Sequence, residues 1–174
     1  MAVEFRSISD TAQNFADNLC RWERSSAGHY EVWFLTLNER ATQRGFWFRY
    51  TIEAPTAAAP YAVLWAAAFD RRNPERNIGL KREYHIDEFR FEGREAFNLQ
   101  LSDSLFTPSR AVGLVDTGVH HIAWNLRFKP CAETYHHVPP TVVRLARPSS
   151  FVCSPNIDTQ FSGQITSLPF VPGS

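Results

Sequence analysis

The sequence contains few cysteines and few glycines, and each shortage argues against a class of protein. Its 3 cysteines are an odd number without CxxC spacing, which argues against a disulfide framework and against a zinc knuckle. We therefore expect reduced thiols and a cytoplasmic location. The 8 glycines stand singly and none opens a helix after a strand, so a phosphate-binding loop is not expected.

The chain also lacks net charge and long apolar runs. It has 18 basic and 18 acidic residues, so no overall field attracts nucleic acid or an anionic membrane, and we predict neither partner. No apolar run approaches the roughly 20 residues that a membrane span requires. The N-terminal sequence MAVEFRSISD has no basic segment followed by an apolar core, unlike a signal peptide.

Patterns typical of metal sites and of nucleophilic catalysis are missing as well. His120 and His121 are adjacent in an expected strand, so their side chains point to opposite faces and cannot share a metal through that strand. His136 and His137 lie in a proline-flanked loop without an HExxH or HxH pattern. There is no GxSxG motif, and Cys20 lies on the apolar side of an expected helix, where a buried, inert thiol is usual. We predict no metal and no cofactor, and we assign no catalytic residue.

Aromatic residues dominate what is present. Three successive segments, 29–38, 43–54 and 61–70, are dense in aromatic and β-branched residues, which fit a pleated sheet better than a helix. Because only short polar or proline-rich breaks separate them, we expect antiparallel neighbours in a large sheet or barrel. Residues 71–83 and 107–118 are expected to be loops, the second with at most one short strand. Periodicity predicts a helix over 9–24 and further strands over 84–92, 97–103, 119–129 and 158–168.

The sequence thus predicts an all-β protein, an antiparallel lipocalin-like β-barrel with one N-terminal helix. We divide the 174 residues into an N-terminal helical segment (1–27), a barrel core (28–130) and a proline-rich C-terminal segment (131–174). The last segment carries a strand that either closes the barrel or is exchanged with another subunit. A homo-oligomer formed through a sheet edge is therefore an expectation.

Two expected strands place a charged residue beside a tryptophan. Glu31 shares a face with Trp33, and Arg49 shares a face with Trp47. If both faces point inward, the two charges need each other as partners, and the pair could orient the polar end of an apolar ligand. In the alternative, Arg49 lies on a solvated face and the core receives the other residues of that strand: Phe46, Phe48, Tyr50 and Ile52.

Several blocks of residues, in this order, resemble one protein family. They are HYEVWFL (29–35), GFWFRYTI (45–52), AVLWAAAFD (62–70), the KR pair at 81–82, HIAWNLRF (121–128) and SPNIDTQFSGQI (154–165). They resemble the first half of the lipocalin-like family of carotenoid 1,2-hydratases (hydroxyneurosporene synthases), whose relatives include fungal decalin-forming Diels–Alderases. The resemblance implies the N-terminal barrel of a protein with two successive lipocalin-like barrels, and it carries no catalytic residue onto this chain.

We therefore predict that the protein binds an apolar or amphipathic small molecule inside an aromatic-lined barrel. One rival prediction is a metal-free hydratase, isomerase or cyclase acting on a polyene-like or polyketide-like substrate. Another is a non-catalytic assembly module. The residues expected to line the interior are Trp33, Trp47, Trp65, Trp124, Glu31 and Arg49.

Overall fold

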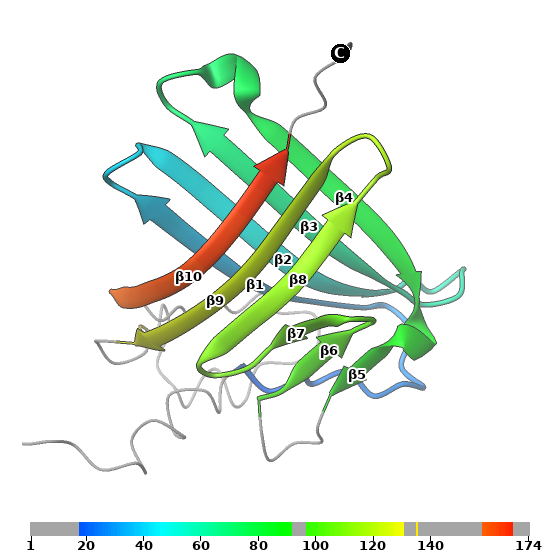
Figure 1. Ribbon diagram of the computed structural model, residues 1–174. Coiled ribbons are helices and arrows are strands. Elements are labelled where there is room, and N and C mark those ends of the chain that lie inside the picture. The colour runs from blue at the N-terminus through cyan, green and yellow to red at the C-terminus, as the bar shows by residue number, and fades with distance from the viewer. Residues whose placement is uncertain (1–17, 92–96, 131–134, 136–157, 169–174) are drawn as a thin grey trace, which may run out of the picture.

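The computed structural model describes residues 18–91, 97–130, 135 and 158–168, which form two antiparallel β-sheets that face one another (Figure 1). In the first sheet each strand is hydrogen-bonded to the next one along the chain. A short 3-10 helix, η2 (Pro74–Arg76), connects its third strand to its fourth. The strands are β1 (His29–Glu39), β2 (Arg44–Ala54), β3 (Tyr61–Asp70) and β4 (Ile78–His85).

The second sheet has six strands in the order β10-β9-β8-β7-β6-β5. A second 3-10 turn, η3 (Ile86–Glu88), leads into it from β4. β10 lies at its edge and pairs with β9 of the same chain, with Phe161 opposite Phe128. The strands are β5 (Phe89–Phe91), β6 (Leu99–Leu101), β7 (Ser104–Phe106), β8 (Arg110–Asp116), β9 (His121–Pro130) and β10 (Thr159–Leu168).

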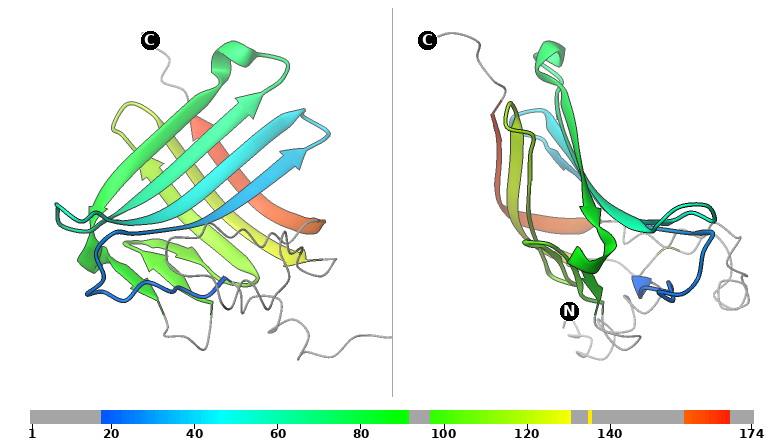
Figure 2. Two further views of the ribbon diagram at one scale, coloured as in Figure 1. Left: turned by 180° about the vertical axis from the view of Figure 1, so that it is seen from behind. Right: turned by 90° about the vertical axis from the view of Figure 1, so that its right-hand side faces the viewer.

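The protein is all-β, as predicted, but the prediction of a closed barrel is wrong. Closure would require β1 to pair with β10, and these two strands are not hydrogen-bonded neighbours in either sheet. The strand that the sequence predicted over 84–92 is also interrupted, because residues 86–88 form the 3-10 turn η3. The break assigns β4 and β5 to different sheets, so the two layers diverge instead of closing on themselves (Figure 2).

The predicted N-terminal helix is not present in the part of it that can be examined. Residues 9–17 lie outside the described residues, and 19–24 are not helical. Contacts with β1 replace the helical hydrogen bonds: the backbone N–H groups of Arg21 and Trp22 donate to the Glu31 carboxylate at 3.0 and 3.1 Å. Tertiary contacts thus override a helical pattern of apolar residues.

The remaining strand predictions agree with the structure in some segments and differ from it in others. The long aromatic segments agree with β1, β2, β3 and β9, and 158–168 agrees with β10. The loop expected over 71–83 is wrong, because residues 78–85 form β4 and pair with β3. The segment 107–118 contains β8, which is longer than the short strand expected there. No helix in the described ranges is long and apolar enough to cross a membrane.

The space between the sheets is filled by side chains. Trp124 stacks on Phe48 with ring centroids 4.3 Å apart, and both rings are almost fully buried. Gly113 on β8 makes room for this tryptophan, because a Cβ at that position would lie 2.2 Å from the indole ring. The interior is therefore a packed core that joins the two sheets.

Candidate functional site

Two of the six residues predicted to bind a ligand lie in this core. Trp33 on β1 and Trp124 on β9 are both buried. Trp33 packs on Phe89 at a centroid distance of 6.0 Å, and its indole N–H donates to the backbone carbonyl of Asn18 at 2.7 Å. Both tryptophans therefore pack against protein groups in the core between the sheets.

Glu31 also points inward, at the end of the core where residues 20–22 cross β1. Beyond its bonds to the backbone of Arg21 and Trp22, it lies 3.0 Å from His29 Nε2. Arg49 lies on the other face of the sheet, because Glu31 is opposite Ile52 in the register whereas Arg49 is opposite Phe34. The expected Glu31–Arg49 pair is therefore not formed, and Glu31 instead anchors the segment that precedes β1.

Cys20 belongs to the same anchor. Its Sγ lies 3.6 Å from Glu31 Oε2. Burial, and after it the neighbouring Glu31 charge, raises the pKa of the Cys20 thiol to about 12. The thiol is therefore neutral at physiological pH and is a poor nucleophile or metal ligand. Within the described ranges, no three His, Cys, Asp or Glu side chains gather where they could hold a metal ion. His136, His137, Cys131 and Cys153 lie outside those ranges.

The other three predicted residues lie on the outer face of the first sheet. There the register places Arg49 opposite Phe34 on one side and opposite Trp65 on the other, with Lys81 following on β4. The core instead receives the alternative set from β2, as the sequence allowed: Phe46, Phe48, Tyr50 and Ile52.

Aromatic rings surround the Arg49 guanidinium. Its Cζ lies 5.6 Å from the ring centroid of Tyr30, 5.8 Å from that of Trp47 and 5.9 Å from that of Trp65. Lys81 on β4, the strand that pairs with β3, places its Nζ 5.6 Å from the centroid of the Trp65 ring. All four distances lie within the range of cation–π attraction. We call these five residues the Arg49 cluster: Tyr30, Trp47, Arg49, Trp65 and Lys81.

Three polar atoms of this face are buried and have no hydrogen-bond partner: Arg49 Nε, Trp65 Nε1 and Thr51 Oγ1. Thr51 is 0% exposed. The ends of β1, β2 and β3 near residues 29–31 and 52–62 bend away from the second sheet (Figure 2, right). The outer face of the first sheet is therefore concave along its strands.

The carboxylates of this face already have donors. Glu53 Oε2 accepts a hydrogen bond from the Tyr61 hydroxyl at 2.5 Å, which raises the pKa of that phenol. Glu83 Oε1 pairs with Lys81 at 3.0 Å. The concave face is therefore short of acceptors, since Arg49 Nε and Trp65 Nε1 can only donate. A ligand that brings an acceptor group and an apolar body matches both its polar and its aromatic groups.

Sequence reasoning found Trp47, Arg49 and Trp65 but assigned them to the interior. It missed Tyr30, Thr51 and Lys81. One signal was available: Trp47 alternates with Phe46 and Phe48 along one strand, so both faces of that strand carry large rings. A strand that is aromatic on both faces indicates a site on the outer face as well as a core.

Comparison with known proteins gives a partial match. No protein-family model and no solved structure matches the chain. Two curated proteins of Mycobacterium tuberculosis, from strains CDC 1551 / Oshkosh and ATCC 25618 / H37Rv, are 43% identical to it over 63 residues, and both are described as uncharacterized. The matched stretch is 36% of this chain and 18% of each relative, so the chain matches less than a fifth of the length of these relatives.

Proposed function

We propose that the protein binds a small amphipathic molecule that carries a carboxylate, and that it does so in the Arg49 cluster on the outer face of the first sheet. The buried, unpartnered donors Arg49 Nε, Trp65 Nε1 and Thr51 Oγ1 are the observation that supports this proposal. The proposal keeps the predicted class of ligand but moves its site from the interior to the outer face.

The energetic motive is the cost of these buried donors. Each buried polar group without a partner costs about 1–3 kcal/mol, and a ligand acceptor recovers part of that cost. Arg49 is well suited to a carboxylate because the guanidinium presents a planar fork of donors, which the surrounding rings hold in place. The rings of Trp47 and Tyr30 offer apolar surface to the remainder of the ligand.

A calorimetric titration with naphthalene-2-carboxylate, compared with naphthalene-2-carboxamide, tests the proposal. We expect saturable binding of the carboxylate and binding of the amide weaker by about tenfold or more, since a hydrogen bond to a charged group contributes about 1.5–3 kcal/mol. The Trp65→Phe variant identifies the indole N–H signal of Trp65 in the NMR spectrum, because that signal is missing from the variant. In the wild type this signal should shift when the carboxylate is added.

Matched variants locate the binding. Arg49→Lys keeps the charge but removes the planar fork, so affinity should fall about tenfold. Arg127→Lys makes the same change at an exposed position of β9 in the second sheet and should leave affinity unchanged. Equal binding of acid and amide, or equal effects of the two variants, would contradict the proposal.

The assembly-module alternative is favoured by one further observation on the same face. Tyr30 is 53% exposed and Phe34 is 46% exposed. Exposed aromatic residues around an arginine are typical of protein–protein interfaces. Under this alternative the wild type sediments as an oligomer or complex that Phe34→Ser dissociates, while naphthalene-2-carboxylate has no effect on the protein.

Catalysis on a polyene-like or polyketide-like substrate, a relationship to the carotenoid hydratases, a homo-oligomer through a sheet edge and a cytoplasmic location remain predictions. The neutral thiol of Cys20 is compatible with a reducing compartment. Incubation with a polyene, followed by mass analysis for the addition of water, would test the hydratase prediction.

A further inference from the structure

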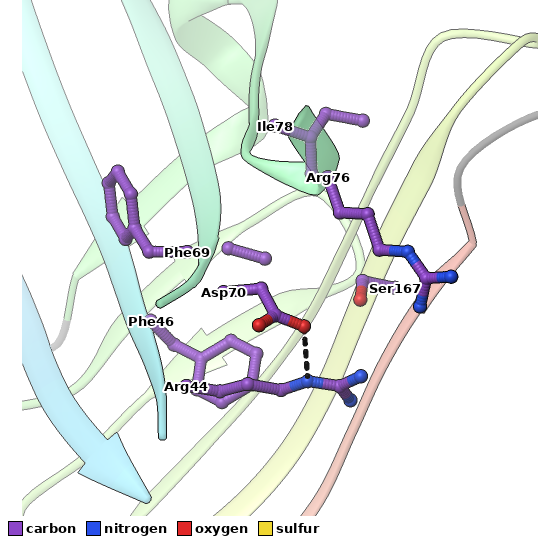
Figure 3. A pocket seen from close by; sticks show the side chains of 8 residues that line it. Arg44, Phe46, Phe69, Asp70, Arg76, Ile78 and Ser167 are labelled. Atoms are coloured by element: carbon purple, nitrogen blue, oxygen red, sulfur yellow. Dashed lines mark hydrogen bonds and ion pairs between the residues drawn. The ribbon is translucent and has the colours of Figure 1, made fainter. Parts of the chain in front are cut away.

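A pocket of about 110 Å³ lies at the open end of the two sheets, away from the Arg49 cluster (Figure 3). Its apolar wall comes from the inner face of the first sheet and includes Phe46 and Ile78. Its polar groups come from both layers, because Arg44, Asp70 and Arg76 belong to the first sheet and its connection, whereas Ser167 belongs to β10.

Asp70, the one carboxylate among the described residues that line this pocket, is fully engaged. Asp70 Oδ2 accepts from Arg44 Nε at 3.4 Å, and Asp70 Oδ1 accepts from the backbone N–H groups of Arg72 and Asn73 at 2.9 and 3.0 Å. Burial raises the pKa of Asp70, but these hydrogen bonds outweigh it, so its pKa lies below the usual value. The carboxylate is therefore charged at neutral pH and is held in the turn that follows β3.

The same turn fixes Arg76 beside the pocket. Asn77 Oδ1 accepts from the backbone N–H of Asp70 at 2.7 Å, and the backbone N–H of Asn77 donates to the carbonyl of Pro74 at 3.1 Å. These bonds close the η2 connection over the end of β3. Among the described residues, the Arg76 guanidinium has no ion pair and no hydrogen bond, and neither has the Ser167 hydroxyl.

The charges of the pocket therefore do not cancel. Among the described residues that line it, two guanidinium groups stand against one carboxylate, which leaves one excess positive charge. Figure 3 shows both guanidinium groups extending to the side where Ser167 lies on β10. The pocket is well below the roughly 300–1,000 Å³ of a site for a drug-sized ligand, so it suits a small group.

We propose that this pocket binds a small tetrahedral oxyanion, such as phosphate or the phosphoryl group of a small molecule, between Arg44 and Arg76 of the first sheet and Ser167 of β10. Arginine recognises phosphoryl oxygens through its planar fork of donors, and a serine hydroxyl adds a further hydrogen bond. An anion in this position links two sheets that share no strand pairing, so it should hold β10 against the first sheet.

The experiment compares inorganic phosphate with chloride at constant ionic strength, by calorimetry and by thermal unfolding. We expect saturable binding of phosphate and a rise in Tm that chloride does not give, because a ligand of the folded state stabilises it. Butyl phosphate distinguishes the two sources of the oxyanion: tighter binding than inorganic phosphate identifies a phosphorylated molecule, and equal binding identifies the free anion. The proposal is wrong if chloride raises Tm as much as phosphate does.

Two variants with exposed side chains provide the control. Arg76→Gln removes the unpaired guanidinium and should weaken phosphate binding at least tenfold. Arg71→Gln makes the same change nearby, at an exposed residue that does not line the pocket, and should leave the affinity unchanged. Equal losses in the two variants would show nonspecific attraction and overturn the proposal.

Hydrogen exchange tests the link between the sheets. Phosphate should slow exchange of the β10 amides in the wild type, and Ser167→Ala should reduce that protection while keeping most of the affinity. If phosphate binds through Arg76 and exchange in β10 does not change, the bridging of the two sheets is refuted.

Discussion

The inner and outer faces of the first sheet carry aromatic side chains of similar size that make different contacts. On the inner face, Phe48 packs ring to ring against Trp124 of the second sheet and loses all exposure. On the outer face, Trp47 and Trp65 lie 6.4 Å apart and hold a cation between them and Tyr30. The number of aromatic residues on a strand face therefore does not show whether that face belongs to the core or to a binding site. The presence of an opposing layer decides which rings are packed.

The sharpest way to break this comparison is to remove one ring from the core between the sheets and one from the outer face of the first sheet. Trp124→Ala should lower the free energy of unfolding by about 3–5 kcal/mol, because it leaves a large cavity in a packed core. Trp65→Ala should cost clearly less, about 1–2 kcal/mol, since solvent already contacts part of this ring and water can fill the space it leaves. Urea unfolding followed by circular dichroism measures both.

Equal losses in those two variants would show that the outer face is covered as completely as the inner one. The docking of another layer on that face would then explain the burial of Thr51.

A glycine in the core, on β8, and a glycine on the outer face of the first sheet sharpen the comparison with a smaller effect. Gly113→Ala places a methyl group 2.2 Å from the Trp124 ring, so the ring must move, and we expect a loss of about 1–3 kcal/mol. Gly79→Ala on β4 is the control, because nothing lies within 4 Å of its Cβ position. That substitution should be neutral or slightly stabilising, since alanine restricts the unfolded chain more than glycine does.

Chemical denaturation of both glycine variants at one temperature gives the two values. A neutral Gly113→Ala would mean that Trp124 has space to move and that the core contains a void beside it.

The dependence of stability on alkaline pH tests whether the Cys20 thiol is buried. The thiol has a pKa of about 12 in the folded protein and about 8.5 when unfolded. A raised pKa stabilises the fold fully below the unfolded value, and this contribution is lost as the pH rises from about 8.5 through about 12. The loss is at most about 1.4 kcal/mol per pH unit.

Cys20→Ala isolates this contribution, because groups that titrate elsewhere are shared by both proteins. The difference in stability between wild type and variant should shrink as the pH rises from 8 to 11. A constant difference would show that Cys20 is not buried beside Glu31 as described.

The smallest effect on stability is expected at Arg49. Arg49→Met keeps much of the apolar stem, and exposed or half-exposed cation–π contacts contribute about 0.5–1 kcal/mol, so unfolding should change by less than about 1 kcal/mol. The same variant should abolish binding of naphthalene-2-carboxylate. If Arg49→Met instead destabilises the protein by several kcal/mol, the guanidinium is a structural part of the sheet and its role in a binding site is excluded.

Much of the fold follows from local patterns, and its failures have identifiable causes. The long aromatic segments are strands because β-branched and aromatic residues fit a half-buried pleated surface. β4 was missed because Lys81, Arg82 and Glu83 make it polar, yet its pairing with β3 brings Leu80 and Tyr84 into the core. The prediction of the N-terminal helix was wrong because the backbone N–H groups of Arg21 and Trp22 donate to the Glu31 carboxylate. The local sequence does not reveal this partner.

For the candidate site, the sequence identified the unusual residues and could not place them. Trp33 and Trp124 were expected to line a cavity with Trp47 and Trp65, but the first pair lies in the core between the sheets and the second on the outer face of the first sheet. Alternation assigns residues to two faces of a strand without stating which face is inside. When both faces are aromatic, as in β2, hydrophobicity does not distinguish them.

By itself the sequence determined that this chain is all-β, where most of its strands run and which side chains share a face, because these properties depend on residue type and on the two-residue period of a strand. Only the tertiary structure decided that η3 divides the strands into two sheets, that Phe48 and not Trp47 meets Trp124, and that Arg49 lies in a concave outer surface. Those outcomes depend on contacts between residues far apart in the chain, whose energies no local pattern contains.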